Sequence, residues 1–483
     1  MSRTFTEDEV RELIEAAVAP LRARVAELEA EVARLKKDSS TSSKPPSSDI
    51  VKPPRPPATA GRRGKRRRGG QPGHRQHLRP SFPPEQVDHF PPIFAWSGEP
   101  LGPEWVATDE FRTIQQVELA EKLVEVTEYR ARLYRCRATG EVIAAPFPEE
   151  VVRAGLIGPR LSALIAYQKG ACHMSYTSIE KFFDDVLHLD VSRGQLAKVV
   201  QKGSAALGPC YAELQAALPE QRALNVDETG HPECGKKLWT WGFHAPGTEG
   251  FTWFHIDPSR SSEVLKEFLG ETFRGVLGCD YFSAYRKFLD ETDAVMQFCW
   301  AHLVRDVKFL TTLLDPVTCR FGVKLLAAIK VLFRVWHRRD AEPRERWKRD
   351  AERAKKEVLK VVRRAPSRSE AQNIAERFRE YGEYYFTFLK VPGVEPTNNA
   401  MERGFRHLVI DRKVTQGTRG EPGRRWCERI WTVLATCAQQ GRSAFQFIYQ
   451  SIGRRSPLGR HRKGRPGPQH PHLASRSRRT AER

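Results

Sequence analysis

The sequence predicts an α/β protein whose central domain spans residues 220–415. From Ala223, three strand-like segments follow one another: ALNVDET, KLWTWGFHA and FTWFHID. Two short apolar strands, GVLGCD and AVMQFCW, then alternate with the helical segments SSEVLKEFLG and YFSAYRKFL. Residues 318–392 are helical in pattern, highly charged and without a strand-like run, which predicts a helical insertion. Three consecutive strands followed by alternating helices and strands is the order of a ribonuclease-H-like fold.

Residues 1–38 are predicted to form a coiled-coil helix. Apolar residues recur from Ile14 to Leu35 at alternating spacings of four and three, with Val at the a positions and Ile or Leu at the d positions. This pattern favours parallel dimers, so we expect a homo-oligomer through this segment. Pro20 interrupts the pattern, which leaves Leu21 to Leu35 as the unbroken seam. A helix packed on its own chain is the alternative.

The chain is strongly basic, with 80 Lys and Arg against 59 Asp and Glu and a net charge of +21. Ile50 to Pro84 and Gly453 to Arg483 together carry 19 of these 21 charges. We interpret residues 39–85 and 453–483 as a disordered basic linker and a disordered basic tail that bind nucleic acid. Arginine suits phosphate, and the candidates in the linker are Arg66, Arg67 and Arg68. A solubilising role is the alternative.

Cellular location is also constrained by composition. The N-terminal stretch is acidic and lacks the apolar core of a secretory signal, and no apolar run has membrane-spanning length. The nine cysteines are scattered and none forms a CxxC pair, which argues against a disulfide framework. We expect a cytoplasmic, nucleoid-associated protein with no membrane partner.

Two smaller regions precede the central domain, and a helical region, residues 416–452, follows it. Residues 86–150 are predicted to be a small β-rich module, on runs such as VELAEKLVEVTEYRARLYRC. Residues 151–215 resemble a helix-turn-helix. One helix has an apolar face of Ile179, Phe182, Phe183 and Val186, the turn holds Leu187 to Val191, and Ser192 can cap a second helix that carries Leu196, Val199 and Val200. Any helical hairpin has this pattern, so DNA binding and plain packing both stay open.

Two carboxylates are candidates for metal binding. Asp227 closes the apolar strand ALNVDET, and Asp280 closes the apolar strand GVLGCD. A carboxylate at the end of a buried strand is costly unless it is hydrogen-bonded or binds a metal, and two on neighbouring strands can bridge hard cations. Strand alternation places Glu228 on the opposite face from Asp227. The alternative for each aspartate singly is a turn or helix cap.

A third carboxylate comes from far along the chain. Glu402 stands in TNNAMERGFRH, near the start of a helix that Thr397 or Asn398 could cap. The alternative is a first-turn glutamate that complements the helix dipole. The basic residues near the acidic segments could hold DNA phosphates or pair with surface acids; they are Arg305, Arg403, Arg406, Arg412 and Lys413.

Cys299 and His302 form a C-x-x-H pair directly after the last predicted strand, in CWAHLVRD. No second ligand pair lies near them in the sequence, so a zinc site lacks two of its four ligands. We therefore expect a role in packing, or in hydrogen bonding near the active site.

Four segments carry a specific family resemblance. VDETG, GCDYFSAY, CWAHLVRD and EPTNNAMERGFRHLVIDRK resemble, in order, the catalytic blocks of the insertion sequence 66 family of DDE transposases, and SSKPPSSD and GGQPGH resemble the leader of that family. The resemblance extends from the N-terminus to about Gly453. It implies that Asp227, Asp280 and Glu402 are a catalytic triad holding two Mg²⁺ ions, with Mn²⁺ as a substitute. The implied partners are the terminal inverted repeats of the element, target DNA and accessory proteins.

One departure from that family concerns zinc. Its members usually carry a module with two Cys pairs, whereas Phe94 and Ser97 stand here where Cys is expected and the second half keeps only Cys136. One Cys cannot build a four-ligand site, so we expect residues 86–150 to be a degenerate, zinc-free module. The expected activity is DNA strand cleavage and strand transfer. The alternatives are a ribonuclease-H-like nuclease or resolvase without strand joining, and a degenerate copy that only binds DNA.

Overall fold

The computed structural model describes residues 6–35, 82–88, 123–148 and 156–455, with the single positions 103, 117, 119, 120 and 152. The chain divides into two compact units, Met1–Pro53 with Ala131–Arg483, and Pro54–Arg130. The linker arginines Arg66, Arg67 and Arg68, the positions Phe94 and Ser97, and the tail from residue 456 lie outside the described residues. The roles assigned to them stay predictions.

Helix α1 (Glu7–Leu35) is the predicted N-terminal helix. The helix continues through Pro20, so the expected interruption there is wrong. A proline removes one backbone donor, and the other hydrogen bonds of a helix this long maintain it on both sides. The seam side chains Ile14, Leu21 and Val25 are 58%, 66% and 55% exposed, so their apolar surface is free in the single chain. Pairing with a second copy stays a prediction.

Where the structure describes the predicted β-rich module, it contains less strand than expected. Strands β1 (Leu133–Arg135) and β2 (Val142–Ala144) form an antiparallel hairpin. Residues 123–132 are described and are not in strands, so the prediction is wrong for them. Their side chains are almost all exposed, so no buried face is present to fix an alternating pattern into a sheet. Cys136 is exposed beside this hairpin.

A helical hairpin follows, as predicted, after helix α3 (Pro159–Gly170). Helix α4 (Tyr176–Leu187) ends where His188 takes a left-handed conformation, and α5 (Arg193–Ala216) begins with a capping box of Ser192 and Gln195. The predicted cap at Ser192 is confirmed. Val186 is exposed instead of buried, and Leu187 takes its place on the apolar face because it lies four residues after Phe183.

The central domain contains a five-stranded mixed sheet. Its strands are β3 (Ala223–Glu233), β4 (Lys236–His244), β5 (Thr252–Asp257), β6 (Val276–Cys279) and β7 (Val295–Phe298). Their order across the sheet is β5-β4-β3-β6-β7. The first three pair antiparallel, whereas β6 pairs parallel with β3 and with β7. The five strands predicted for this domain are therefore confirmed.

Strand β3 is longer than predicted, and Asp227 lies within it. The parallel pairing with β6 ends at Asn225, but the antiparallel pairing with β4 continues to Glu233. Cys234 and Gly235 form the hairpin turn with φ values of 46° and 80°. Two positive φ angles are typical of a type I′ turn, which matches the twist of the strands it joins. The strand therefore does not close at Asp227; only its contact with β6 ends near that point.

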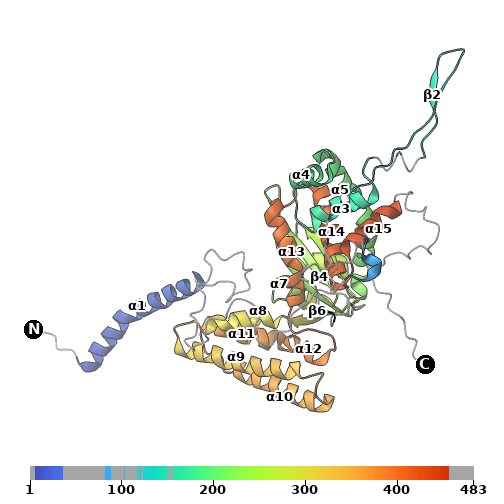
Figure 1. Cartoon of the computed structure of the whole chain (residues 1–483). Helices are drawn as coiled ribbons and strands as arrows, with labels where there is room; N and C mark the ends of the chain where they lie inside the picture. The colour runs from blue at the N-terminus through green and yellow to red at the C-terminus, as the bar shows by residue number, and fades with distance from the viewer. Residues whose placement is uncertain are drawn as a thin grey trace, which may run out of the picture. The chain divides into compact units, whose positions relative to one another are not determined.

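Helices cover both faces of the sheet (Figure 1). On one face, Trp241 of β4 packs edge-on against Tyr285 of α7 (Ser283–Asp290), which contacts α6 (Ser262–Leu269). On the other face, Gly242 contacts Met401 of α13 (Asn399–Thr415) so closely that a Cβ would lie 2.4 Å from the methionine methyl carbon. Gly242 pairs with Asp227 of β3, so the two residues face the same side of the sheet. Glycine at this position therefore lets α13 approach the sheet closely beside Asp227.

The predicted insertion is helical throughout the part described. After α8 (Trp300–Leu310) come α9 (Pro316–His337), α10 (Arg344–Val362), α11 (Ser369–Tyr381), the 3-10 turn Gly382–Tyr385 and α12 (Thr387–Lys390). Helices α9 and α10 lie side by side (Figure 1). The chain then continues through α13 to α14 (Glu421–Gln439) and α15 (Ala444–Arg455). None of the helices described is long and apolar enough to cross a bilayer.

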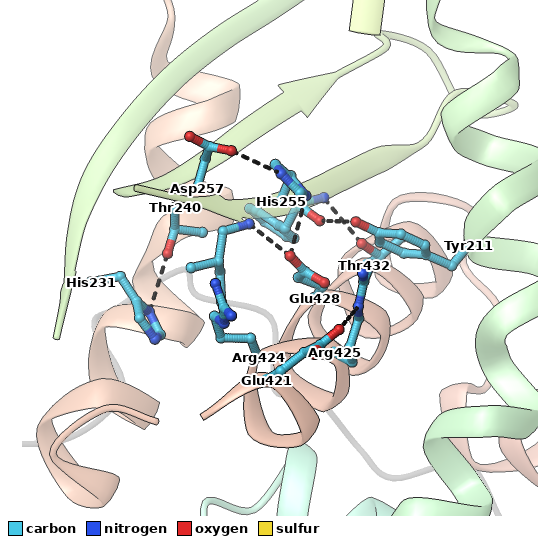
Figure 2. Close-up of polar contacts among 12 residues, drawn as sticks. Tyr211, His231, Thr240, His255, Asp257, Glu421, Arg424, Arg425, Glu428 and Thr432 are labelled. Carbon is cyan, nitrogen blue, oxygen red and sulfur yellow. Dashed lines mark hydrogen bonds and ion pairs between the residues drawn. The ribbon is translucent and has the colours of Figure 1, made fainter. Parts of the chain in front are cut away.

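Side chains of α14 pair with the outer edge of strand β5. Thr436, Thr432 and Glu428 accept hydrogen bonds from the backbone N–H groups of residues 252, 254 and 256, at 3.1, 3.0 and 2.9 Å. Residues four apart on a helix advance about 6 Å, close to the two-residue step of a strand, so the two series stay in register. Figure 2 shows Glu428 and Thr432 beside this strand. The helix thus closes an edge that would otherwise be open to another strand.

Replacing Thr432 by valine should lower the free energy of unfolding by about 1–3 kcal/mol, because the N–H of Phe254 would stay buried without its acceptor. Denaturant unfolding measures the loss. The control is Thr311→Val, since that hydroxyl is exposed and bonds only within its own turn, and its effect should stay within about 0.5 kcal/mol. Equal losses in both variants would contradict the role of the edge contact.

Candidate active site

The sheet register brings Asp227 and Asp280 together. Strands β3 and β6 run parallel, with Ala223, Leu224 and Asn225 opposite Val276, Leu277 and Gly278. Continuing this register by two residues places Asp227 level with Asp280. Both side chains are half-buried, and each accepts one backbone hydrogen bond of 2.9 Å, from the N–H groups of Glu228 and Phe282.

Asn398 attaches the start of α13 to strand β3 beside Asp227. Its side-chain amide donates to the carbonyl oxygen of Val226 at 2.9 Å, one residue before Asp227, and its backbone N–H lies 3.1 Å from the sulfur of Cys299. The backbone N–H of Glu402 in turn donates to the Asn398 carbonyl at 3.1 Å. Asn398 stands at the N-cap position of α13. The predicted side-chain cap is absent there, because the Asn398 amide bonds to β3 instead.

Asp227 responds to the charges of both other predicted carboxylates. Burial raises the pKa of Asp227 well above its usual range, and the negative charges of Glu228, Asp280 and, more weakly, Glu402 raise it further. Burial also raises the pKa of Asp280, against the opposing effects of the Phe282 N–H and of the guanidinium groups of Arg260 and Arg377. The aspartates therefore favour protonation unless a cation compensates their charge.

Glu402 is bound to basic side chains of α8. Arg305 donates to both of its carboxylate oxygens at 3.4 and 3.3 Å, and the Nε2 atom of His302 lies 3.7 Å from one of them. Across the described residues, no three His, Cys, Asp or Glu side chains lie close enough together to hold one metal ion. The structure thus brings Asp227 and Asp280 together and places Glu402 near them, but paired with Arg305.

Cys299 and His302 lie where hydrogen bonding to this site was expected. Burial lowers the pKa of His302, whereas the charge of Glu402 opposes that effect. The Nδ1 atom of His302 and the Oδ1 atom of Asn398 are buried and have no hydrogen-bond partner among the described residues. Two residues that contact Glu402, through the His302 ring and the Asn398 carbonyl, thus each have a polar atom with unused hydrogen-bonding capacity.

Glu228 belongs to a network on the opposite face of β3, as strand alternation predicted. Its carboxylate accepts hydrogen bonds from the Tyr285 hydroxyl and from Arg260, the latter at 2.7 Å. Sequence reasoning missed Arg260 and Arg377, whose charges both act on Asp280. Arg377 comes from the insertion and pairs with Asp306 at 2.7 Å. No sequence motif marks either arginine, since each reaches the site only through the fold.

The basic residues of α13 differ in exposure. Arg403, Arg406 and Lys413 are exposed, so they can be reached by a polyanion. Arg412 is half-buried and donates to the Gly230 carbonyl and to the Thr229 hydroxyl, the latter at 3.1 Å. Burial lowers its pKa to about 10. The guanidinium of Arg412 thus already donates hydrogen bonds to β3, and a DNA phosphate could bind only to its remaining N–H groups.

The residues fit a divalent metal ion by their chemistry. Hard cations such as Mg²⁺ prefer carboxylate oxygens, and Asp227 and Asp280 supply them on adjacent strands. Burial raises the pKa of both aspartates, and the charge of Asp280 raises that of Asp227 further, so a bound cation would favour their charged forms. Two half-buried carboxylates at adjacent strands are typical of a class of proteins suited to metal-dependent chemistry.

Comparison with known proteins narrows this class. The family model described as "Transposase IS66 family" matches residues 154–425, which include the whole sheet, the insertion and α13. The chain belongs to this family. A second model, described only as a family of unknown function, matches residues 1–80.

Two relatives come from Sinorhizobium fredii and are themselves uncharacterized. The uncharacterized protein y4qI is 25% identical over 354 residues, which cover 66% of this chain and 64% of that protein. The uncharacterized protein y4hP is 23% identical over 362 residues, covering 68% of this chain and 64% of that protein. The chain thus aligns with less than two thirds of the length of either relative.

Proposed function

We propose that this protein is a DDE transposase that binds the ends of an insertion sequence, cleaves DNA strands and joins them to target DNA. The observation that carries the proposal is the register of β3 with β6, which sets Asp227 beside Asp280 on the face that α13 covers. The strand order and the pairing directions support a ribonuclease-H-like core. Membership of the transposase family supports DNA as the substrate.

Each residue has a distinct part in this proposal. Asp227, Asp280 and Glu402 would hold two divalent cations, Mg²⁺ or Mn²⁺; when bound, these activate a water or a 3′-hydroxyl and stabilise the leaving oxygen. Asn398 positions the helix that carries Glu402. Arg305 holds the Glu402 carboxylate and would have to release it for metal binding. Arg403, Arg406 and Lys413, with the linker and the tail, would contact DNA phosphates, and the N-terminal helix would pair protomers.

A strand-transfer assay tests the proposal and separates it from its rivals. The substrate is a labelled duplex that ends in the terminal repeat flanking this gene, incubated with target DNA and Mg²⁺ or Mn²⁺. A transposase should nick the repeat end and join it to the target. A nuclease or resolvase without strand joining would release the nicked strand only, and a degenerate copy would bind the DNA without cutting it.

The basic tail is expected to set non-specific affinity. Deleting residues 456–483 removes eight Lys and Arg residues. Each DNA phosphate that the truncated protein no longer neutralises should flatten the slope of log K against log salt by roughly 0.9, so the slope should fall by several units. Titrations at several salt concentrations, with the terminal repeat and with random DNA, measure both slopes. A selective decrease in affinity for the repeat would show that the tail reads sequence instead.

The N-terminal module is expected to bind no structural zinc, because Cys136 is exposed and Phe94 and Ser97 stand where cysteines would be needed. Metal analysis of the purified full-length protein should find less than about one tenth of an equivalent of tightly bound zinc. One equivalent that survives dialysis, and is absent from a Cys136→Ser variant, would contradict this.

A further inference from the structure

The helical insertion contains a cavity of about 710 Å³ between α9, α10 and the segment that follows α12. Its aromatic lining consists of Trp336, Trp347, Phe386 and Phe388. Its basic lining consists of Arg339, Arg344, Lys348, Lys355 and Lys390, against the acids Asp340, Glu352 and Glu395. Its volume is in the range of ligand-binding pockets. The reaction proposed above uses none of these residues.

Planar groups in this cavity are held in place. Phe386 and Phe388 are buried beneath it, whereas Trp347 is half-buried and its ring N–H donates to the Val335 carbonyl at 3.0 Å. The Arg339 guanidinium lies over the Trp336 ring, 4.2 Å from its centre. A fixed indole and a stacked guanidinium both offer flat surfaces on which an aromatic ligand can stack.

The cations of α10 are placed to meet an anion. Arg344 and Lys348 are four residues apart, so they share one face of the helix, and both are exposed. Lys348 pairs with Glu345 at 2.9 Å, a surface pair of small energetic weight, and Arg344 forms no ion pair with any residue in the described part of the chain. A ligand combining a planar ring and a phosphate would match this lining.

One wall of the cavity leads to the candidate active site. Pro392, Gly393, Val394 and Glu395 line it, and the same segment ends at Asn398, which binds the Val226 carbonyl. Asn398 comes three positions after Glu395, and these three steps can span at most about 10 Å. The wall of the cavity at Glu395 is therefore close along the chain to the residue that contacts β3 beside Asp227.

We propose that this cavity binds one unpaired nucleotide of a DNA strand close to the cleavage site. This inference rests on the proposed function, since it takes DNA as the substrate. The base would stack on Trp347 or on the Arg339 guanidinium, and its phosphate would contact Arg344 and Lys348. A base within a duplex cannot enter, because its faces are covered by its neighbours, so the cavity selects an unpaired one.

Binding measurements with the full-length protein, without divalent metal, test the proposal. Two probes have equal duplex length: one is blunt and the other carries a short single-stranded thymine overhang. The variant Arg344→Ala/Lys348→Ala should bind the overhang DNA about tenfold more weakly, with less than a twofold change for blunt DNA. The matched control is Arg346→Ala/Arg349→Ala, which removes two exposed arginines of the same helix that do not line the cavity. It should leave the preference for the overhang unchanged.

Two substitutions of Trp347 isolate stacking from folding. Trp347→Phe and Trp347→Leu both lose the hydrogen bond to Val335, but only phenylalanine keeps an aromatic face. The leucine variant should bind overhang DNA roughly tenfold more weakly than the phenylalanine variant, at equal thermal stability. Equal affinities of these two variants would exclude a stacking role for this ring.

The outcomes separate this proposal from the proposed function. If the protein binds no DNA at all, the proposed function fails and the inference fails with it. If the protein binds both probes, but the cavity variant and the control variant lower the affinity for overhang DNA by the same factor, only the nucleotide site is overturned. Displacement of overhang DNA from the cavity by polyglutamate, with no preference for the overhang over blunt DNA, would assign the cavity to an acidic protein partner instead.

Discussion

Replacing Asp227 by asparagine should reduce DNA cleavage by at least about a thousandfold while making the metal-free protein more stable. A bound metal supplies several kcal/mol of transition-state stabilisation, and each 1.4 kcal/mol changes a rate about tenfold. The gain in stability has the opposite origin. Without a cation, the Asp227 carboxylate is partly desolvated and repelled by Glu228 and Asp280, and the neutral amide of asparagine removes that repulsion.

The pH dependence of stability follows from the sign of this shift. The pKa of Asp227 is raised in the folded state, so the folded protein binds this proton more tightly than the unfolded chain. The ordinary pKa of Asp227 is 3.8. As the pH rises from this value toward the higher pKa of the folded state, Asp227 destabilises the fold increasingly, and above the folded-state pKa the destabilisation is complete. The asparagine variant should lack this decline. Thermal unfolding of both proteins at a series of pH values from below 3.8 upward, with chelator present, measures the difference.

Asp280→Asn should lose cleavage to a similar degree, because it removes the other half of the pair. The control is Asp290→Asn, which removes an exposed carboxylate at the end of α7 and should change neither rate nor stability. If Asp227→Asn were inactive but also less stable, the missing activity could come from misfolding. If it retained full metal-dependent cleavage, Asp227 would not be a metal ligand.

The sheet could be predicted because its pattern is local. Each strand is a short apolar run ended by a turn or a helix, and burial on both faces requires such runs. The equal separations of Ala223 from Val276 and of Asp227 from Asp280 also lie in the sequence, but they become a register only once β3 and β6 are known to be parallel neighbours. The length of β3 could not be predicted, because Asp227 and Glu228 interrupt its apolar run and its end is set by pairing with β4.

Contacts between segments far apart in the chain could not be predicted from the sequence. The pairing of Arg305 with Glu402 joins residues 97 positions apart, and Arg377 reaches Asp306 across 71 positions. Any of the many arginines in the chain could have made these contacts, because charge alone does not specify a partner. For the same reason Arg412 was a candidate for DNA phosphates or surface acids, although the fold directs it to the backbone of β3.

Asn398 should be the residue whose loss most impairs the site without touching metal or DNA. Replacing it by alanine removes the donor to the Val226 carbonyl, at a cost of about 1–3 kcal/mol in stability. It also frees the first turn of α13, which carries Glu402. A displacement of about 1 Å at a reacting group can reduce a rate about a hundredfold. We therefore expect cleavage at saturating DNA to fall roughly a hundredfold, with the KM for DNA unchanged.

The neighbouring Asn399 provides the matched control. It has the same side chain, is exposed, and stands one residue further into α13, so Asn399→Ala should leave rate and stability nearly unchanged. Both variants are compared at a temperature where unfolding curves show them folded, so a lower rate cannot reflect unfolded protein. A purely structural role for Asn398 would lower stability and leave the cleavage rate of the folded fraction intact. A hundredfold loss in that fraction, with unaltered DNA binding, would mean that the hydrogen bond to Val226 positions Glu402 for catalysis.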